Sequence, residues 1–261
     1  MGAGPLTVVA GGYQDLEAAR WLPWDGVLVF ADRSANTLYQ LRPPAAVSVC
    51  RAGVPQPFGL ALDGSGRLHV AAIGPARVVR LTAGGSQTLA DRTTVDPSFT
   101  PNDLTVRSDG TIFVTSPDAE VVRIAPDGGA SAVWKTDGGV HSPNGIVLAP
   151  DERTLYVGFW KEHVVRAFDL DPSGSLGSGR ILAATAAQAD GMTVDRAGDL
   201  YVSTQQGVQV FAPDGRLWGA ISVPQPVFNC AFGGPDGTTL YILTASVLYG
   251  VELAVPGVVG R

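Results

Sequence analysis

The sequence has few cysteines, which limits how its fold can be stabilised. Only 2 cysteines occur among 261 residues. Cys50 falls in a segment that we place at the outer edge of a repeated unit, and Cys230 falls near the centre of another. The two thiols are therefore expected to lie too far apart for a disulfide. Unpaired thiols favour a reducing, cytoplasmic location.

Charged residues are also scarce, at 16% of the chain, and the formal net charge is -6. No basic cluster is present, so we expect no nucleic acid partner. No apolar run is long enough to span a bilayer, and we expect no membrane partner. The N-terminus has no basic segment followed by an apolar one, and Leu6 stands where a myristoylation signal requires Ser or Thr. Long amphipathic helical patterns are absent as well.

Glycine and proline, by contrast, are abundant, with 33 Gly and 19 Pro beside 45% hydrophobic residues. This composition is typical of many short strands joined by tight turns. One pattern returns six times at intervals of about forty residues: an X-Gly-like step, an apolar run, an Asp-Gly-type turn and a second apolar run. A repeat that extends from end to end leaves no place for a boundary, so we predict a single domain over residues 1–261.

Each repeat predicts three strands. The six units cover residues 17–41, 57–81, 101–124, 143–170, 189–211 and 228–253. A fourth, outer strand is expected in the segments that follow the first five units, at 47–50, 86–89, 131–134, 180–183 and 220–223.

The last unit has no such segment, and residues 6–9 are expected to pair beside 247–253 instead. The prediction is an all-β, six-bladed β-propeller with four-stranded blades, closed by the N-terminal strand. A sheet sandwich is the alternative, but it leaves the regular spacing of X unexplained.

The residues at X form the candidate site. In order they are Glu17, Phe58, Asn102, Asn144, Asp190 and Asn229. The first strand of each propeller blade lines the central channel, so these side chains are expected in one layer around the axis. A single Asn or Asp beside Gly is usually an ordinary turn residue. Several hard oxygen donors at equivalent steps of a closed ring favour one divalent cation, with Ca²⁺ first and Zn²⁺, Mg²⁺ or Mn²⁺ as alternatives.

Four segments resemble the senescence marker protein (regucalcin), gluconolactonase and related family of propeller hydrolases. They cover residues 100–110, 142–156, 190–195 and 229–237. The resemblance implies that Glu17, Asn102, Asn144 and Asp190 hold the cation and that the reaction is lactone hydrolysis. It also favours Asp190 as general base, since a carboxylate can take the proton of an attacking water.

The sequence departs from the family pattern where substrate would bind. Some relatives carry an arginine two residues before the third-blade asparagine, and here that position is Thr100. Phe58 occupies the X position of the second unit, and Phe159 and Trp160 replace small polar residues at the rim. Antiparallel pairing places the ends of the second strands, including Asp32 and Arg33, around the same mouth. Phe58, Thr100, Phe159 and Trp160 therefore predict a less polar substrate than a sugar lactone.

Two further residues are candidates for supporting roles. His141 lies three residues before Asn144 and is a candidate for shuttling a proton or contacting substrate, although an ordinary loop histidine is the favoured interpretation. Asp103 follows Asn102 and is expected to point toward the blade interface and support the ligands through a hydrogen bond. No Gly-x-Ser-x-Gly elbow occurs, so a serine hydrolase is not indicated.

Three functions are compatible with these observations. The first is a metal-dependent hydrolase of lactones or esters that acts on a small molecule. The second keeps the metal but catalyses cyclisation, isomerisation or epimerisation in a biosynthetic pathway. The third is a non-catalytic propeller that binds a protein at its rim, which would have no need of converging carboxylates. We expect a monomer or a weak homo-oligomer.

Overall fold

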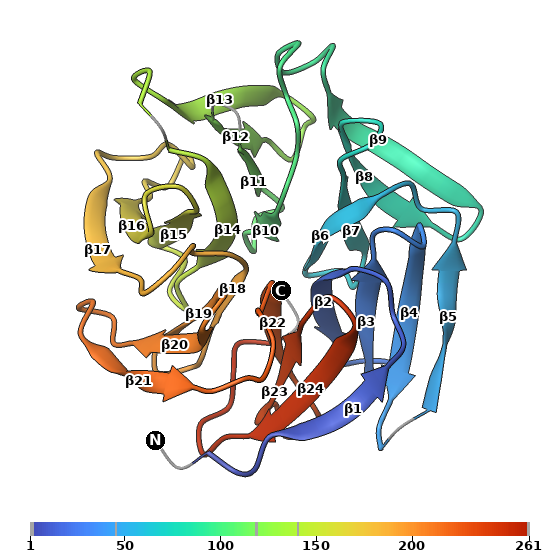
Figure 1. The fold of residues 1–261 in the computed structure, drawn as a ribbon. Helices are drawn as coiled ribbons and strands as arrows, with labels where there is room; N and C mark the ends of the chain where they lie inside the picture. The colour runs from blue at the N-terminus through green and yellow to red at the C-terminus, as the bar shows by residue number, and fades with distance from the viewer. Residues whose placement is uncertain (1–2, 45, 118–119, 140, 260–261) are drawn as a thin grey trace.

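The computed structural model describes residues 3–44, 46–117, 120–139 and 141–259 (Figure 1). Within these ranges six antiparallel sheets of four strands are arranged around a central axis. The predicted six-bladed β-propeller is confirmed. None of the described residues belongs to a helix that is long and apolar enough to cross a membrane.

The blades follow one another in the order of the chain. Within each of the first five blades, the strands follow in sequence order from the axis outward. Blade 1 contains β2 (Leu16–Leu22), β3 (Val27–Asp32), β4 (Thr37–Arg42) and β5 (Ala46–Ala52). Blade 2 contains β6 (Pro57–Leu62), β7 (Leu68–Ala72), β8 (Arg77–Thr82) and β9 (Gly85–Asp91). Blade 3 contains β10 (Leu104–Val106), β11 (Ile112–Ser116), β12 (Glu120–Ile124) and β13 (Ala130–Lys135).

The second half of the chain repeats this arrangement. Blade 4 contains β14 (Pro143–Leu148), β15 (Thr154–Phe159), β16 (Val164–Asp169) and β17 (Arg180–Ala184). Blade 5 contains β18 (Met192–Val194), β19 (Leu200–Thr204), β20 (Gly207–Phe211) and β21 (Leu217–Ile221). Blade 6 contains β22 (Asn229–Gly233), β23 (Thr239–Leu243) and β24 (Val247–Glu252) from the C-terminal part, and β1 (Thr7–Gly11) from the N-terminal part.

The first and last parts of the chain close the ring together. β1 pairs antiparallel with β24, with Thr7 opposite Gly250, and the two strands lie side by side in Figure 1. The Thr7 hydroxyl donates a further hydrogen bond to the Gly250 carbonyl at 3.1 Å. The predicted pairing of the N-terminal strand with the last unit is therefore confirmed, and it covers an edge that would otherwise be open.

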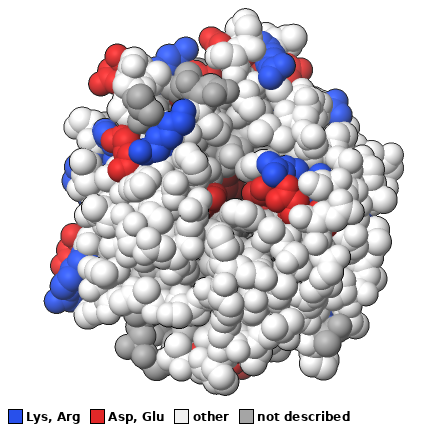
Figure 2. Space-filling view, in the orientation of Figure 1, with Lys and Arg blue, Asp and Glu red and all other residues white. Residues whose placement is uncertain are grey.

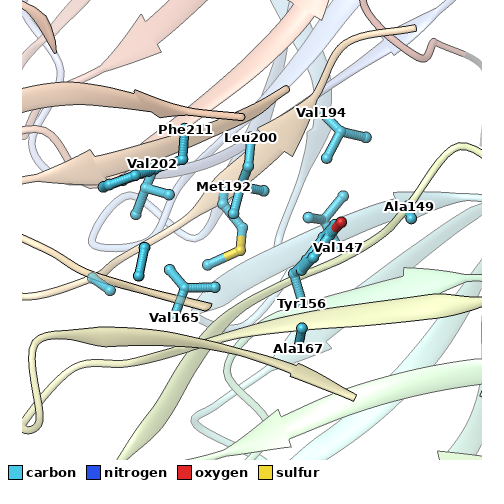
Figure 3. Close-up of a cluster of buried hydrophobic side chains, with 12 residues drawn as sticks. Val147, Ala149, Tyr156, Val165, Ala167, Met192, Val194, Leu200, Val202 and Phe211 are labelled. Carbon is cyan, nitrogen blue, oxygen red and sulfur yellow. The ribbon is translucent and has the colours of Figure 1, made fainter. Parts of the chain in front are cut away.

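The hydrophobic core lies mainly between neighbouring blades. Figure 3 shows the cluster between blades 4 and 5, where Val147, Tyr156 and Val165 meet Met192 and Val202. Second strands such as β3, β11 and β19 are buried along their whole length because a blade covers each of their faces. Outer strands such as β5 are mostly exposed. Burial thus falls from the second strand of each blade to the outer strand.

The C-terminal segment covers one end of the channel. The N–H groups of Gly257 and Val258 donate to the carbonyls of Gly237 and Val194 at 2.9 and 3.1 Å. Beside Val258 lies a small cavity of about 20 Å³ whose walls include Arg20 and Thr193. The opposite mouth, where the inner strands begin, is therefore the route to the X residues.

The two cysteines are both unpaired, as the sequence predicts. Cys50 is exposed on β5, and Cys230 is buried on β22.

Candidate functional site

Local irregularities of the inner strands position the X residues. The pairing of β2 with β3 passes from Leu16 to Ala18, so Glu17 is an extra residue without a direct partner. The strand pairing shifts by one residue in the same way at Phe58 in β6 and at Asn144 in β14. Such β-bulges redirect a side chain at the end of a strand. Here they occur at the mouth of the channel.

Asn102 and Asp190 have an equivalent backbone arrangement just before β10 and β18. Asn102 N–H donates to the Thr115 carbonyl at 2.8 Å, while Thr115 N–H donates to the carbonyl of Asp103 at 2.9 Å. In blade 5, the Ser203 carbonyl accepts the Asp190 N–H, and the Ser203 N–H donates to the carbonyl of Gly191. Two inner residues thus share one partner, as in a bulge. Asn229 differs, because it pairs regularly with Leu243.

The glycine after X is required where adjacent inner strands approach closely. A Cβ atom on Gly145 would lie 2.1 Å from the Asp190 carbonyl oxygen, and one on Gly191 would lie 2.2 Å from Cγ of Asn229. No side chain fits at these distances, so packing of the ring requires glycine after Asn144 and after Asp190. It also shows that Asn144, Asp190 and Asn229 follow one another around the axis.

The predicted ligands lie in a polar and largely buried setting. Glu17 and Asn102 are 9% and 5% exposed, and Asn144 and Asp190 are half-buried. The side-chain amides of Asn102 and Asn144 have no hydrogen-bond partner among the described residues. The Asp190 carboxylate accepts only the N–H of Gly191 from that part of the chain, at 3.0 Å through Oδ1. Buried polar groups normally have partners, and these are free to bind a ligand.

A guanidinium group lies beside the acidic ring. Arg33 Nε donates to Asp15 Oδ2 at 2.7 Å, and Arg33 Nη2 also contacts this oxygen. Nη2 lies 3.5 Å from Glu17 Oε1, and the guanidinium carbon is 4.8 Å from the centre of the Phe58 ring. Figure 2 shows acidic side chains at the bottom of the central hollow, next to a basic group. Sequence analysis placed Arg33 at the rim without a role and missed Asp15, because neither lies at an X position.

The carboxyl groups influence each other's protonation. Burial raises the pKa of Glu17 well above its ordinary value, the charge of Asp190 raises it further, and Arg33 opposes the shift. Burial likewise raises the pKa of Asp190 to about 8, with Asp103 adding to the shift. The pKa of Asp103 rises to about 6, again mainly through burial, although Arg20 lowers it. Without further positive charge, these groups would not all be ionised at neutral pH.

The net charge of the site is the sum over the charged groups in and beside the ring. Asp15, Glu17, Asp103 and Asp190 contribute four carboxylates, and Arg20 and Arg33 contribute two guanidinium groups. The fully ionised set therefore lacks two positive charges, which one divalent cation would supply. No group of three or more His, Cys, Asp or Glu side chains is arranged to hold a metal within the described ranges. A cation here would depend on the Asn102 and Asn144 oxygens, and a donor set of two carboxylates and two amides fits a hard ion.

Asp103 points toward the interface between blades 3 and 4. Its carboxylate accepts the N–H of Leu104 at 2.8 Å and lies 3.4 Å from the N–H of Ile146 in β14. The orientation is the one expected from the sequence. Asp103 thereby connects the strand that follows Asn102 with the strand that carries Asn144.

The prediction that Phe159 lines the mouth is wrong. Its side chain is fully buried and packs with Phe113, Trp134 and Phe168 between blades 3 and 4. Leu155 and Val157 belong to the same cluster, so the alternation of β15 continues to its last residue. Trp160 and Phe58 are half-buried at strand ends near the mouth. Thr100 is half-buried too, and its hydroxyl donates to the Ser98 carbonyl at 3.2 Å.

His141 interacts with blade 4 rather than with the ring. Its Nδ1 lies 2.5 Å from Glu162 Oε1, and its Nε2 lies 2.8 Å from Asp137 Oδ1. Its aromatic neighbours are Trp134 and Phe159. These contacts raise its pKa, Asp137 more than Glu162. None of the described contacts of His141 involves an X residue, and both ring nitrogens are already engaged.

Comparison with known proteins places this arrangement in a family. Residues 16–246 match the model of the SMP-30/Gluconolactonase/LRE-like region. The chain belongs to this family. The match begins one residue before Glu17 and includes every predicted ligand, which confirms the resemblance seen in the sequence.

Several family members are similar over most of their length. The gluconolactonase of Zymomonas mobilis is 28% identical over 91% of this chain and 78% of its own. The pentonolactonase of Haloferax volcanii is 27% identical over 88% of this chain and 81% of its own. The solved structure of a gluconolactonase from Xanthomonas campestris superimposes with a TM-score of 0.88, with 28% identity, and covers 97% of this chain and 90% of that one.

Proposed function

We propose that the protein is a lactone hydrolase whose reaction takes place at the ring of Glu17, Asn102, Asn144 and Asp190. One observation carries this proposal. The fully ionised groups in and beside the buried ring at the open mouth lack two positive charges, and the Asn102 and Asn144 side-chain amides have no hydrogen-bond partner among the described residues. The gluconolactonases and the pentonolactonase that match this chain along most of its length support the same reaction.

The four ring residues are the proposed ligands of one divalent cation. Ca²⁺ fits best because all four donors are hard oxygens, while Zn²⁺, Mg²⁺ and Mn²⁺ are the alternatives. A cation bound there would supply a Lewis acid that polarises the lactone carbonyl. Glu17 and Asp190 would then stay ionised side by side, because their mutual repulsion is compensated.

Asp190 is the proposed general base. Gly191 N–H holds one of its oxygens, Oδ1, and Oδ2 has no hydrogen-bond partner among the described residues. The second oxygen is thus available to take a proton from water as the water oxygen bonds to the lactone carbonyl carbon, and to return that proton to the ring oxygen as the C–O bond breaks. Proton transfer of this kind contributes roughly a hundred- to ten-thousand-fold to rate.

The mouth favours a substrate with an apolar portion. Phe58 and Trp160 are the proposed aromatic surface there, and the burial of Phe159 makes this surface smaller than the sequence predicts. Burial of an extra ~80 Å² of apolar surface would contribute about 2 kcal/mol to binding. Trp160→Ala should accordingly raise KM more for alkyl-substituted lactones than for unsubstituted ones.

Hydrolysis is favoured over the other two functions. Cyclisation, isomerisation or epimerisation would use the same ring, but the relatives named above, which match most of this chain, are lactonases. A non-catalytic propeller that binds a protein at its rim would not need buried carboxylates that lack compensating positive charge. A small-molecule substrate is therefore proposed, and the exposed, unpaired Cys50 is consistent with a reducing, cytoplasmic setting.

A lactone panel tests the proposal. Purified protein is assayed with gluconolactone, unsubstituted lactones and alkyl-substituted lactones, after chelation and after readdition of Ca²⁺. We expect hydrolysis that disappears with chelator and returns with the ion. Activity that is insensitive to chelation contradicts the cation, and inertness toward every lactone and ester contradicts the reaction.

A further inference from the structure

The guanidinium group of Arg33 is held in a fixed position at the mouth. Nε and Nη2 are bound to Asp15 Oδ2, and Nη2 also faces Glu17 at 3.5 Å. The flat face of the group covers the Phe58 ring at 4.8 Å. A group fixed from two sides loses little conformational entropy when it makes one more contact.

One nitrogen of this group has no partner. Nη1 carries two N–H donors, and neither forms a hydrogen bond with a described residue. The Arg33 side chain as a whole is 35% exposed. At the position where some family members carry an arginine, Thr100 has its hydroxyl engaged by Ser98. At the mouth, blade 1 therefore supplies an arginine, whereas blade 3 has Thr100.

We propose that Arg33 is a specificity-determining residue, whose Nη1 binds an oxygen of the substrate other than those of the reacting ester. This inference rests on the proposed lactonase function. An unsubstituted lactone that displaces water from Nη1 would leave its two donors without partners, and a donor that loses its water without gaining a partner lowers affinity. The substrate thus presents its polar group to Arg33 and its apolar portion to Phe58 and Trp160.

Three variants test the role of Arg33. Arg33→Met removes the donors, Arg33→Lys keeps the charge without the fork, and Asp15→Asn weakens the hold on the group. Arg67→Met is the matched control, because Arg67 is also paired with an aspartate, Asp63, but in a turn remote from the X residues. Far-UV circular dichroism and melting temperature establish that each variant is folded.

The readout is the ratio of kcat/KM for gluconolactone to that for δ-valerolactone, which has the same ring without hydroxyl groups. Loss of one hydrogen bond to a charged donor should lower this ratio about tenfold or more in Arg33→Met, mainly through the KM of gluconolactone. Arg33→Lys should fail to restore it, Asp15→Asn should give an intermediate ratio, and Arg67→Met should match wild type. An unchanged ratio in Arg33→Met, or full restoration by lysine, overturns the proposal while lactonase activity stands.

A binding measurement separates this inference from the proposed function. If wild type hydrolyses no lactone, the proposed function fails, and gluconate binding is measured by calorimetry instead. Gluconate that binds wild type at least tenfold more tightly than Arg33→Met supports the role of Arg33. Equal binding, or no binding to either protein, overturns it.

Discussion

Single residues at the inner strands determine how closely the six blades approach the axis. Gly145 and Gly191 are needed because the backbone or side chain of the following blade occupies the space of a Cβ atom. The same close approach brings Asn144 and Asp190 to one mouth. Packing and site geometry are therefore coupled at the scale of one atom.

Gly145→Ala tests this coupling. We expect a loss of at least about 1–3 kcal/mol in the free energy of unfolding, because the new methyl group forces the inner strands apart. Urea titration measures the loss. Gly84→Ala is the control, since a Cβ atom there meets nothing within 4 Å. Equal stability of both variants would refute the tight contact.

His141 should make stability depend on pH. Its pKa is raised by Asp137 and Glu162, so the folded state binds a proton more tightly than the unfolded state. The stabilisation is fully present below the ordinary pKa of histidine, about 6.5, and is lost as pH rises through the raised value. The difference in unfolding free energy between wild type and His141→Gln should therefore shrink from pH 6 to pH 9. A difference that is constant over this range would contradict the ion pairs.

The positions of the candidate site residues were easier to predict than the surroundings of their side chains. The X positions can be identified in the sequence because each precedes a repeated apolar run. The fold then places them around one channel. Phe159 was assigned to the wrong side because the alternation of Leu155 and Val157 was not continued to the strand end. The pairing of Arg33 with Asp15 gives no periodic signal, since it depends on how two strand ends of blade 1 meet.

Among the elements, β1 determines how the ring of blades closes. It supplies the outer strand of blade 6 and so joins the two ends of the chain. Strand locations were predictable from alternation and turn residues. The bulges at Glu17, Phe58 and Asn144 were not, because a single extra residue leaves the apolar pattern almost unchanged.

Deletion of residues 1–10 tests this closure. The truncated protein should melt roughly 5 °C or more below the full-length chain and aggregate more readily, because β24 becomes an exposed edge. Differential scanning calorimetry measures the shift, and a single transition in the full-length protein would support one domain over residues 1–261. Identical melting of the two proteins would mean that β1 contributes nothing to closure.

At the scale of the whole molecule, the propeller gathers acidic groups from separate blades into one buried site. Glu17, Asp103 and Asp190 are distant in sequence but coupled in charge. Only closure of the ring creates this coupling, which no local segment would show. The C-terminal segment covers the far end of the channel, so the site is accessible from one side.

The most direct test of the account is a calorimetric titration with Ca²⁺ of chelator-treated wild type, Asp190→Ala and Asn229→Ala. Wild type and Asn229→Ala should each bind one ion, because Asn229 pairs regularly and lies outside the proposed ligand set. Asp190→Ala should bind at least about a hundredfold more weakly, since loss of a direct ligand should cost no less than loss of a supporting residue. Equal Ca²⁺ binding by wild type and Asp190→Ala would contradict the axial site.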